Sequence, residues 1–179
     1  MNQDINKSLE TLKSGGLILY PTDTVWGIGC DATNIEAVAK IFKLKQREDS
    51  KSLICFVADD RMLKKYIKKI PEVAYDILDV TEDPITIIYD EPQNLASNLI
   101  ASDNTIAIRI PTDDFCFQLL RLFTGAIVST SANSRGEPTP KSFKNITLEI
   151  LKGLNYLENF HHAKIFATPS PIIKSSTST

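Results

Sequence analysis

The sequence predicts a single α/β domain, built as a twisted mixed sheet flanked by helices. Segments with apolar residues at helical spacing alternate with short β-branched runs along the 179 residues, which is typical of this class. No Gly/Ser/Pro-rich linker divides the chain, and no repeat with a period of about 20–50 residues is found. We therefore expect one domain over residues 1–174, followed by a polar tail at 175–179.

The elements follow one another in a regular order, and each is predicted by a local pattern. Helices are expected where apolar residues recur every three or four positions, and strands where short apolar runs are bounded by turn formers. The expected order is a helix ending at Gly15-Gly16, a strand at 17–20, a loop at 21–24, a helix over 37–45, a strand at 53–57, a helix over 63–70, strands at 85–89 and 105–110, a helix over 115–123, a strand at 126–130, a helix within 142–151 and a short strand at 171–173.

Composition narrows the class of function. Twenty basic and 22 acidic residues give a net charge of −2, which disfavours a general nucleic-acid binder. The longest apolar runs are only a few residues and the N-terminal residues lack an apolar leader, so we expect a cytoplasmic protein with no membrane contact.

The cysteines and histidines do not form a recognisable ligand pattern. Cys30, Cys55 and Cys116 are widely spaced and lie beside apolar residues, which indicates buried, reduced thiols rather than disulfides or a zinc site. The adjacent His161 and His162 have no acidic or cysteine partner nearby and are interpreted as surface residues. The sequence therefore predicts no protein-bound metal.

The densest basic segment spans residues 43–51 and contains Lys45, Arg47 and Lys51. A helix end that turns into a strand here can bring these three cations around one central basic cavity, where they suit a triphosphate. The alternative is a solvated helix end whose positive charges complement the helix dipole. Charge alone leaves both interpretations open.

A second basic run between Arg61 and Lys69 contains no acidic residue and lies opposite an apolar face. It is interpreted as the solvated face of an amphipathic helix, with a contact surface for a phosphate backbone as the alternative.

The segment 129–138 follows an expected buried strand and presents hydroxyls, an amide and a glycine turn at that strand's carboxyl end. Open α/β sheets bind ligands at this position, and Ser131 and Asn133 can hold phosphate or ribose oxygens. A turn whose Asn and Ser side chains bond their own backbone is the alternative. Neither GxxxxGK[ST] nor GxGxxG is present, and Ser131 lacks a GxSxG context.

Arg109 is a charged residue within the apolar strand 105–110. Burying it without an anionic partner is costly, so we expect such a partner. It is either an internal carboxylate such as Asp31 or Asp113, or the carboxylate of a small substrate.

Taken in order, these motifs resemble the YrdC-like threonylcarbamoyl-adenylate synthases. The resemblance rests on the Tyr20 to Asp31 segment, the basic 45–51 segment, Pro84-Ile-Thr86, Ile108 to Pro111, and the 129–138 loop, and it covers about residues 8–173. It implies a reaction of L-threonine, bicarbonate and ATP that gives threonylcarbamoyl-adenylate and pyrophosphate. The product serves the modification of the adenosine next to the tRNA anticodon.

The resemblance also implies a division of roles. Lys45, Arg47 and Lys51 would act in catalysis and bind the ATP phosphates, Ser131 and Asn133 would bind the adenylate, and Thr24, Trp26 and Arg109 would bind threonine. Mg²⁺ would bridge phosphate oxygens and water, and a downstream threonylcarbamoyl transferase complex would take the product. Transient contact with tRNA is expected. The alternative function is a module that binds tRNA or double-stranded RNA without synthase activity.

Overall fold

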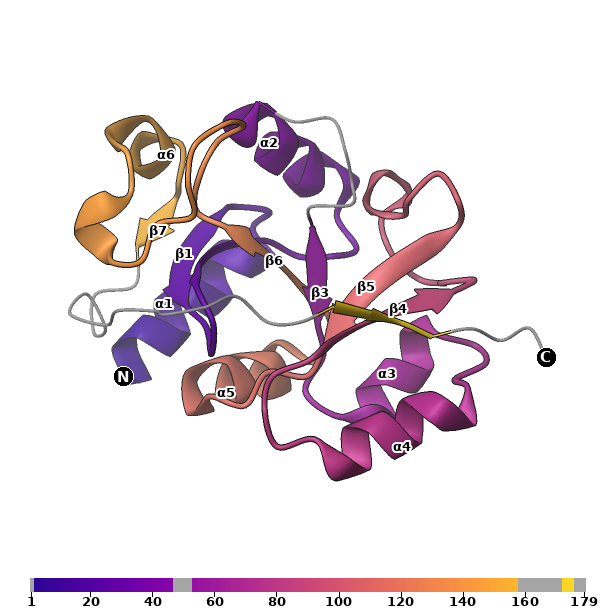
Figure 1. Cartoon of the computed structure of the whole chain (residues 1–179). Coiled ribbons are helices and arrows are strands. Elements are labelled where there is room, and N and C mark those ends of the chain that lie inside the picture. Colours follow the sequence, from indigo (N-terminus) through magenta and orange to yellow (C-terminus); the bar gives the residue numbers. More distant parts are fainter. Residues whose placement is uncertain (1, 47–52, 158–171, 176–179) are drawn as a thin grey trace.

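A twisted mixed sheet forms the centre of the molecule (Figure 1). The structure, a computed structural model, describes residues 2–46, 53–157 and 172–175. Within these residues the sheet has eight strands in the order β7-β1-β2-β6-β3-β5-β4-β8. In chain order they are β1 (Ile18–Pro21), β2 (Trp26–Gly29), β3 (Ile54–Phe56), β4 (Thr86–Asp90), β5 (Thr105–Arg109), β6 (Ile127–Ser131), β7 (Tyr156–Leu157) and β8 (Ile172–Lys174).

Helices lie on both sides of the sheet and at its ends (Figure 1). Their starts carry the capping residues that the sequence pattern requires: the side chain of Asn34 accepts a hydrogen bond at the start of α2, and that of Asp113 does so at the start of α5. The helical segments are α1 (Asn2–Lys13), α2 (Ile35–Lys45), α3 (Asp60–Tyr66), α4 (Glu72–Val80), α5 (Asp114–Phe123) and α6 (Leu148–Lys152), with short 3₁₀ turns η2 (Ser97–Leu99) and η3 (Phe143–Asn145).

The pairing directions explain why helices alternate with strands. β3 runs parallel to β5, β1 to β7 and β4 to β8, whereas β2 and β6 join their neighbours in antiparallel pairs. A parallel pair requires a crossover connection, and α3 and α4 lie in the connection between β3 and β5. The expected mixed sheet is therefore confirmed.

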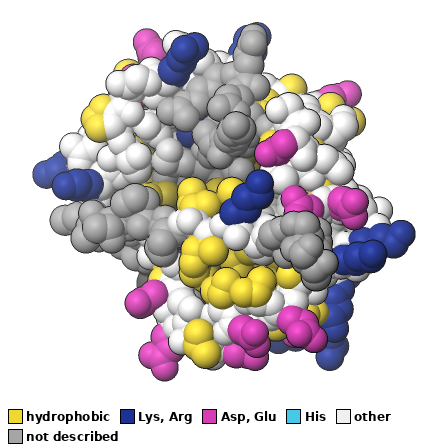
Figure 2. All heavy atoms as spheres, turned by 45° about the vertical axis from the view of Figure 1, so that its right-hand side comes forward, with side chains coloured by type: hydrophobic (Ala, Val, Ile, Leu, Met, Phe, Trp, Pro, Cys, Tyr) yellow, Lys and Arg dark blue, Asp and Glu magenta, His cyan; other side chains and the backbone are white. Residues whose placement is uncertain are grey.

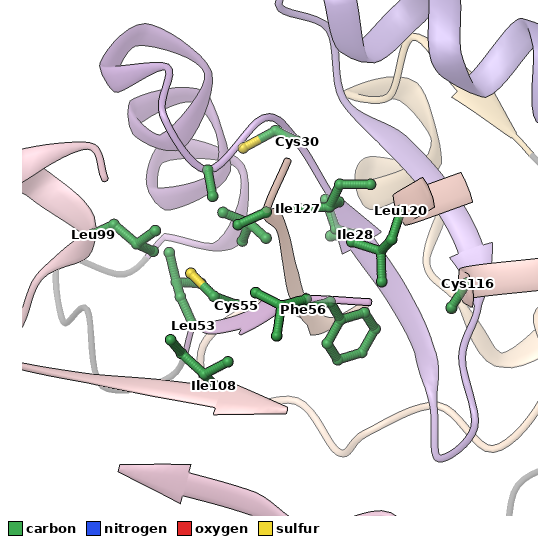
Figure 3. Packing of buried hydrophobic residues seen from close by; sticks show 14 of the residues in the cluster. Ile28, Cys30, Leu53, Cys55, Phe56, Leu99, Ile108, Cys116, Leu120 and Ile127 are labelled. Atoms are coloured by element: carbon green, nitrogen blue, oxygen red, sulfur yellow. The ribbon is translucent and has the colours of Figure 1, made fainter. Parts of the chain in front are cut away.

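The core is a continuous layer of apolar side chains between sheet and helices (Figure 3). Cys55 of β3 and Ile108 of β5 come from two paired strands, and Leu53 directly precedes β3. Figure 3 shows them packed beside Leu99 of η2 and Ile127 of β6. Burying a side chain of this size contributes about 1.5–3 kcal/mol. This packing fixes the strand ends that carry the polar side chains of the candidate site.

Gly29 allows one close contact within the sheet. A Cβ at this position would lie 2.6 Å from Tyr20 Cε1 and 2.8 Å from the carbonyl oxygen of Val128. No larger residue fits, because the second atom belongs to the backbone. The Tyr20 ring thus packs directly over β2, and its hydroxyl donates to the Val128 carbonyl at 3.2 Å.

Most expected elements are confirmed, but the sequence interpretation missed β2, α4 and β7. No element was expected over residues 26–29, although Trp26 and Ile28 alternate with Gly27 and Gly29 as a strand requires. The expected helix over 63–70 is too long: α3 ends at Tyr66, and Ile67 forms a bridge with Pro92.

The remaining differences concern the last third of the chain. The helix expected within 142–151 is divided into η3 and α6. The final strand is β8, shifted by one residue from the expected range. Ser175, the first residue of the expected tail, is buried and its hydroxyl donates to the Ile88 carbonyl at 2.6 Å.

Candidate functional site

Arg109 lies at the end of β5 and is buried, with 3% of its side chain exposed. Its Nη2 lies 3.0 Å from Asp23 Oδ1 and donates to Thr24 Oγ1 at 3.0 Å. The guanidinium carbon also lies 4.7 Å from the ring centroid of Phe56, which pairs with Arg109 across the sheet. The turn 22–25 and the end of β5, far apart in sequence, therefore form one cluster.

The turn that carries Thr24 is held by Thr22. The buried Thr22 hydroxyl donates to the Val25 carbonyl at 2.8 Å and accepts from the backbone N–H groups of Thr24 and Val25 at 3.1 and 3.0 Å. A single side chain thus fixes the backbone between β1 and β2 and aims Thr24 toward Arg109.

The expected partner of Arg109 is only half confirmed. An internal carboxylate does pair with Arg109: it is Asp23, which was not one of the two expected carboxylates, Asp31 and Asp113. Asp31 Oδ1 accepts from the N–H and hydroxyl of Thr33, and Asp113 accepts the N–H of Cys116 as a helix cap. Local turn and cap geometry explains both of these carboxylates.

Lys45 forms a second cluster at the end of β6. It is the last residue of α2, and its side chain is buried rather than solvated. Nζ donates to Thr130 Oγ1 at 2.6 Å and to the Ser131 carbonyl at 2.7 Å. The interpretation of Lys45 as part of a solvated helix end is therefore wrong.

The loop that follows β6 folds back on itself. The Ser131 hydroxyl donates to the side-chain oxygen of Asn133, and Asn133 Nδ2 donates to the Glu137 carbonyl at 2.7 Å. The N–H of Arg135 donates to the Lys45 carbonyl at 2.9 Å. Lys45 thus joins the end of α2 to both the start and the tip of the loop.

Strand pairing relates the two clusters. Gly27 of β2 pairs with Ser131 of β6, and Thr24 precedes Gly27 by three residues. The Cα atoms of Thr24 and Gly27 are at most about 11 Å apart, because each residue spans no more than about 3.6 Å. With about 5 Å between the paired strands, the Cα atoms of Thr24 and Ser131 are at most about 16 Å apart.

Trp26 is fully buried, with 0% of its surface exposed, and its ring contacts that of Phe143 at a centroid distance of 5.7 Å. Its side chain therefore belongs to the core in this structure. Two other predicted site residues, Arg47 and Lys51, lie outside the described residues, as do His161 and His162.

A cavity of about 230 Å³ lies away from these clusters. Its lining is mainly apolar, with polar groups from Asp103, Thr105 and Lys174. Figure 2 shows one face with hydrophobic side chains near its centre, a basic side chain beside them, and further acidic and basic groups nearer its edge. The expected central basic cavity is not confirmed.

Three further observations concern the cysteines, metal-binding groups and membrane-spanning helices of the described residues. Burial raises the pKa of the Cys30, Cys55 and Cys116 thiols, so all three are kept protonated near neutral pH. Within residues 2–46, 53–157 and 172–175, no group of three His, Cys, Asp or Glu side chains is placed to hold a metal ion. No helix in the described part of the chain is long and apolar enough to cross a membrane.

Comparisons with known proteins show which family the sequence matches. The Sua5/YciO/YrdC family model, described as telomere recombination, matches residues 10–179. A threonylcarbamoyl-AMP synthase of Coxiella burnetii is 31% identical over 147 residues, which cover 82% of this chain and 79% of that protein.

Two solved structures share the fold. P. abyssi Sua5, solved in complex with L-threonine, is 25% identical with a TM-score of 0.84, and the match covers 96% of this chain and 50% of that chain. E. coli YciO is 23% identical with a TM-score of 0.86, and the match covers 100% of this chain and 87% of that chain. The family model and the curated synthase relative both span most of the sequence, and the chain belongs to the Sua5/YciO/YrdC family.

Proposed function

We propose that this protein is a threonylcarbamoyl-AMP synthase. The observation that carries the proposal is its 31% identity to a curated synthase over 82% of the chain. In the reaction the threonine amine attacks the carbon of bicarbonate, and water leaves. An oxygen of the resulting carbamate then attacks the α-phosphorus of ATP, and the bond to pyrophosphate breaks. The products are threonylcarbamoyl-AMP, pyrophosphate and water.

Threonine is assigned to the cluster of Arg109 and Thr24. A guanidinium can bind a carboxylate through two N–H groups, and the Thr24 hydroxyl can bond a small polar side chain. The 3.0 Å contact between Arg109 Nη2 and Thr24 Oγ1 supports this assignment, because it places both groups at one point. In this proposal Trp26 supports the threonine site indirectly: it is buried in the core directly after the turn 22–25 that carries Thr24.

The nucleotide is assigned to the cluster at the end of β6. Lys45 brings positive charge to Ser131, and the loop through Asn133 offers a hydroxyl and an amide for the adenylate. Arg47 and Lys51 complete the phosphate contacts in the proposal. The cations stabilise charge that develops on the leaving pyrophosphate, so no covalent nucleophile is required.

The pairing of Gly27 with Ser131 supports placing the two substrates side by side. In the proposal, threonine beside Thr24 and a phosphate beside Ser131 lie near the paired ends of β2 and β6. Holding both reactants this close removes much of the entropic cost of the reaction. In the proposal, Mg²⁺ enters bound to the ATP phosphates as part of the substrate.

The product is a reactive mixed anhydride, so we propose that a threonylcarbamoyl transferase complex takes it up for tRNA modification in the cytoplasm. Transient contact with tRNA is assigned to the exposed basic residues that begin at Arg61 on α3, because they have no acidic residue among them.

The test is pyrophosphate release by the purified chain with MgATP, threonine and bicarbonate. We expect release that needs both threonine and bicarbonate. Release without threonine would instead indicate carbamoyl transfer to another acceptor. No release, together with salt-sensitive tRNA binding, would favour the RNA-binding alternative.

A further inference from the structure

Asp23 joins three segments around Arg109. It lies in the turn 22–25, and 4% of its side chain is exposed. Its Oδ1 lies 3.0 Å from Arg109 Nη2. Its Oδ2 accepts the N–H of Thr112 at 2.9 Å and the Thr112 hydroxyl at 3.3 Å, in the segment between β5 and α5. One carboxylate therefore fixes the turn, the end of β5 and the start of the next connection.

The two oxygens of Asp23 are bound in different ways. Oδ2 has directed hydrogen bonds from Thr112, so the position of the carboxylate is set from the backbone. Oδ1 is buried and accepts no hydrogen bond from the described residues, although Arg109 Nη2 is only 3.0 Å away. The attraction between Asp23 and Arg109 is therefore carried by charge rather than by an aligned N–H.

This geometry leaves an N–H of Arg109 Nη2 directed at Thr24 Oγ1. A guanidinium that formed an aligned fork with Asp23 would commit two N–H groups to that carboxylate. Here the charge of Asp23 holds the guanidinium in place while its hydrogen bond goes to Thr24. Thr112 sets the position from which the charge of Asp23 acts on Arg109.

We propose that Asp23 is a positioning residue for threonine: it holds Arg109 at the angle at which that side chain and Thr24 together meet the amino acid. The proposal rests on the proposed function, because it concerns the threonine half of that site. It predicts that Asp23 controls the affinity for threonine and has little influence on ATP.

A purely structural ion pair makes a different prediction. Removing one partner of a buried pair destabilises the fold, and a general loosening would weaken both substrates together. The ratio of the two KM values separates these roles, since only a positioning role changes one without the other.

The first variant is Asp23→Asn, which keeps the size of the side chain and an oxygen for Thr112 but removes the charge. We expect the apparent KM for threonine to rise about tenfold or more and the KM for ATP to change by less than about twofold. Asp23→Glu restores the charge and should recover part of the threonine affinity. Asp114→Asn, at an exposed position in the first turn of α5, is the matched control and should behave as wild type.

The outcomes are decisive in each direction. A folded Asp23→Asn protein with a wild-type KM for threonine, or with equal rises in both KM values, overturns the proposal. If Asp23→Asn does not fold, Thr112→Val is used, because it removes one donor to Asp23 and keeps the backbone N–H. We then expect a rise of about two- to fivefold in the KM for threonine alone, and no rise overturns the proposal. Absence of product from the wild-type enzyme would instead refute the proposed function.

Discussion

Replacing Arg109 by Lys tests whether the planar guanidinium, rather than positive charge alone, selects threonine. Lysine retains the charge near Asp23 but cannot reproduce a two-pronged contact with a carboxylate. It also loses the stacking on Phe56, where the guanidinium carbon lies 4.7 Å from the ring centroid. The hydrogen bond to Thr24 Oγ1, 3.0 Å long in the wild type, depends on the same group.

The expected loss follows from these contacts. A hydrogen bond to a charged group contributes about 1.5–3 kcal/mol, and a factor of ten in affinity corresponds to about 1.4 kcal/mol. Loss of one of the two contacts to the substrate carboxylate therefore weakens threonine binding at least about tenfold. ATP binds at the other cluster, so its affinity should change by less than about threefold.

The assay is pyrophosphate release at varied threonine and saturating ATP, repeated at varied ATP. Arg121→Lys is the matched control, because Arg121 is exposed on α5 and also lies over an aromatic ring, with its guanidinium carbon 5.7 Å from the centroid of Phe117. It should leave both KM values unchanged. If Arg109→Lys has a normal KM for threonine but a strongly raised KM for ATP, Arg109 belongs to the phosphate site. No change in either value would reduce Arg109 to an internal ion-pair partner.

Further predictions concern the nucleotide cluster, the thiols and the basic surface. Lys45→Met should raise the KM for ATP at least about tenfold, because it removes a buried positive charge beside Ser131. Lys43→Met, at an exposed position on the same helix, should leave the KM for ATP unchanged. Equal kinetics of the two variants would contradict the role of Lys45. Ser131→Ala should give a smaller loss of about two- to fivefold, because water can replace a neutral donor, and a complete loss of activity would show a larger role. Burial raises the pKa of all three thiols, so their contribution to the free energy of unfolding is fully present below the pKa of an unfolded thiol, about 8.5, and is lost as the pH rises above it. Denaturant titrations should show the free energy of unfolding falling by up to about 1.4 kcal/mol per pH unit for each thiol. A flat profile between pH 9 and 10 would refute this. The double variant Lys64→Glu/Lys65→Glu should weaken tRNA binding and flatten its salt dependence without changing pyrophosphate release; unchanged tRNA binding would exclude α3 as the contact surface.

Most of the fold could be predicted from the sequence, because the helices and inner strands have strong local sequence patterns. Apolar periodicity identified the expected helices that became α1, α2 and α5, and Gly15-Gly16 marked the end of the first. α4 was missed although Pro71 at its start and the spacing of Ala74, Ile77 and Leu78 indicate a helix. β7 has only two residues, and its pairing with β1 depends on tertiary contacts that no local pattern contains.

The candidate site was less accessible from the sequence. The need for an anionic partner of Arg109 followed from the cost of burying a charge. The identity of that partner did not follow, because Asp23 meets Arg109 only through the packing of the β1–β2 turn against the end of β5. Likewise, the contact of Lys45 with Thr130 joins residues 85 positions apart. The order of the motifs identified the family, but it did not show that Asp23 contacts Arg109 or that Lys45 contacts Thr130.

The most direct test of the central claim is detection of the product itself. The purified chain is incubated with MgATP, threonine and ¹³C-labelled bicarbonate, quenched rapidly and analysed by mass spectrometry. We predict a threonylcarbamoyl-AMP species that carries the ¹³C label, appears in step with pyrophosphate and is absent when threonine is left out. Formation of AMP and pyrophosphate with no labelled adduct would contradict the account.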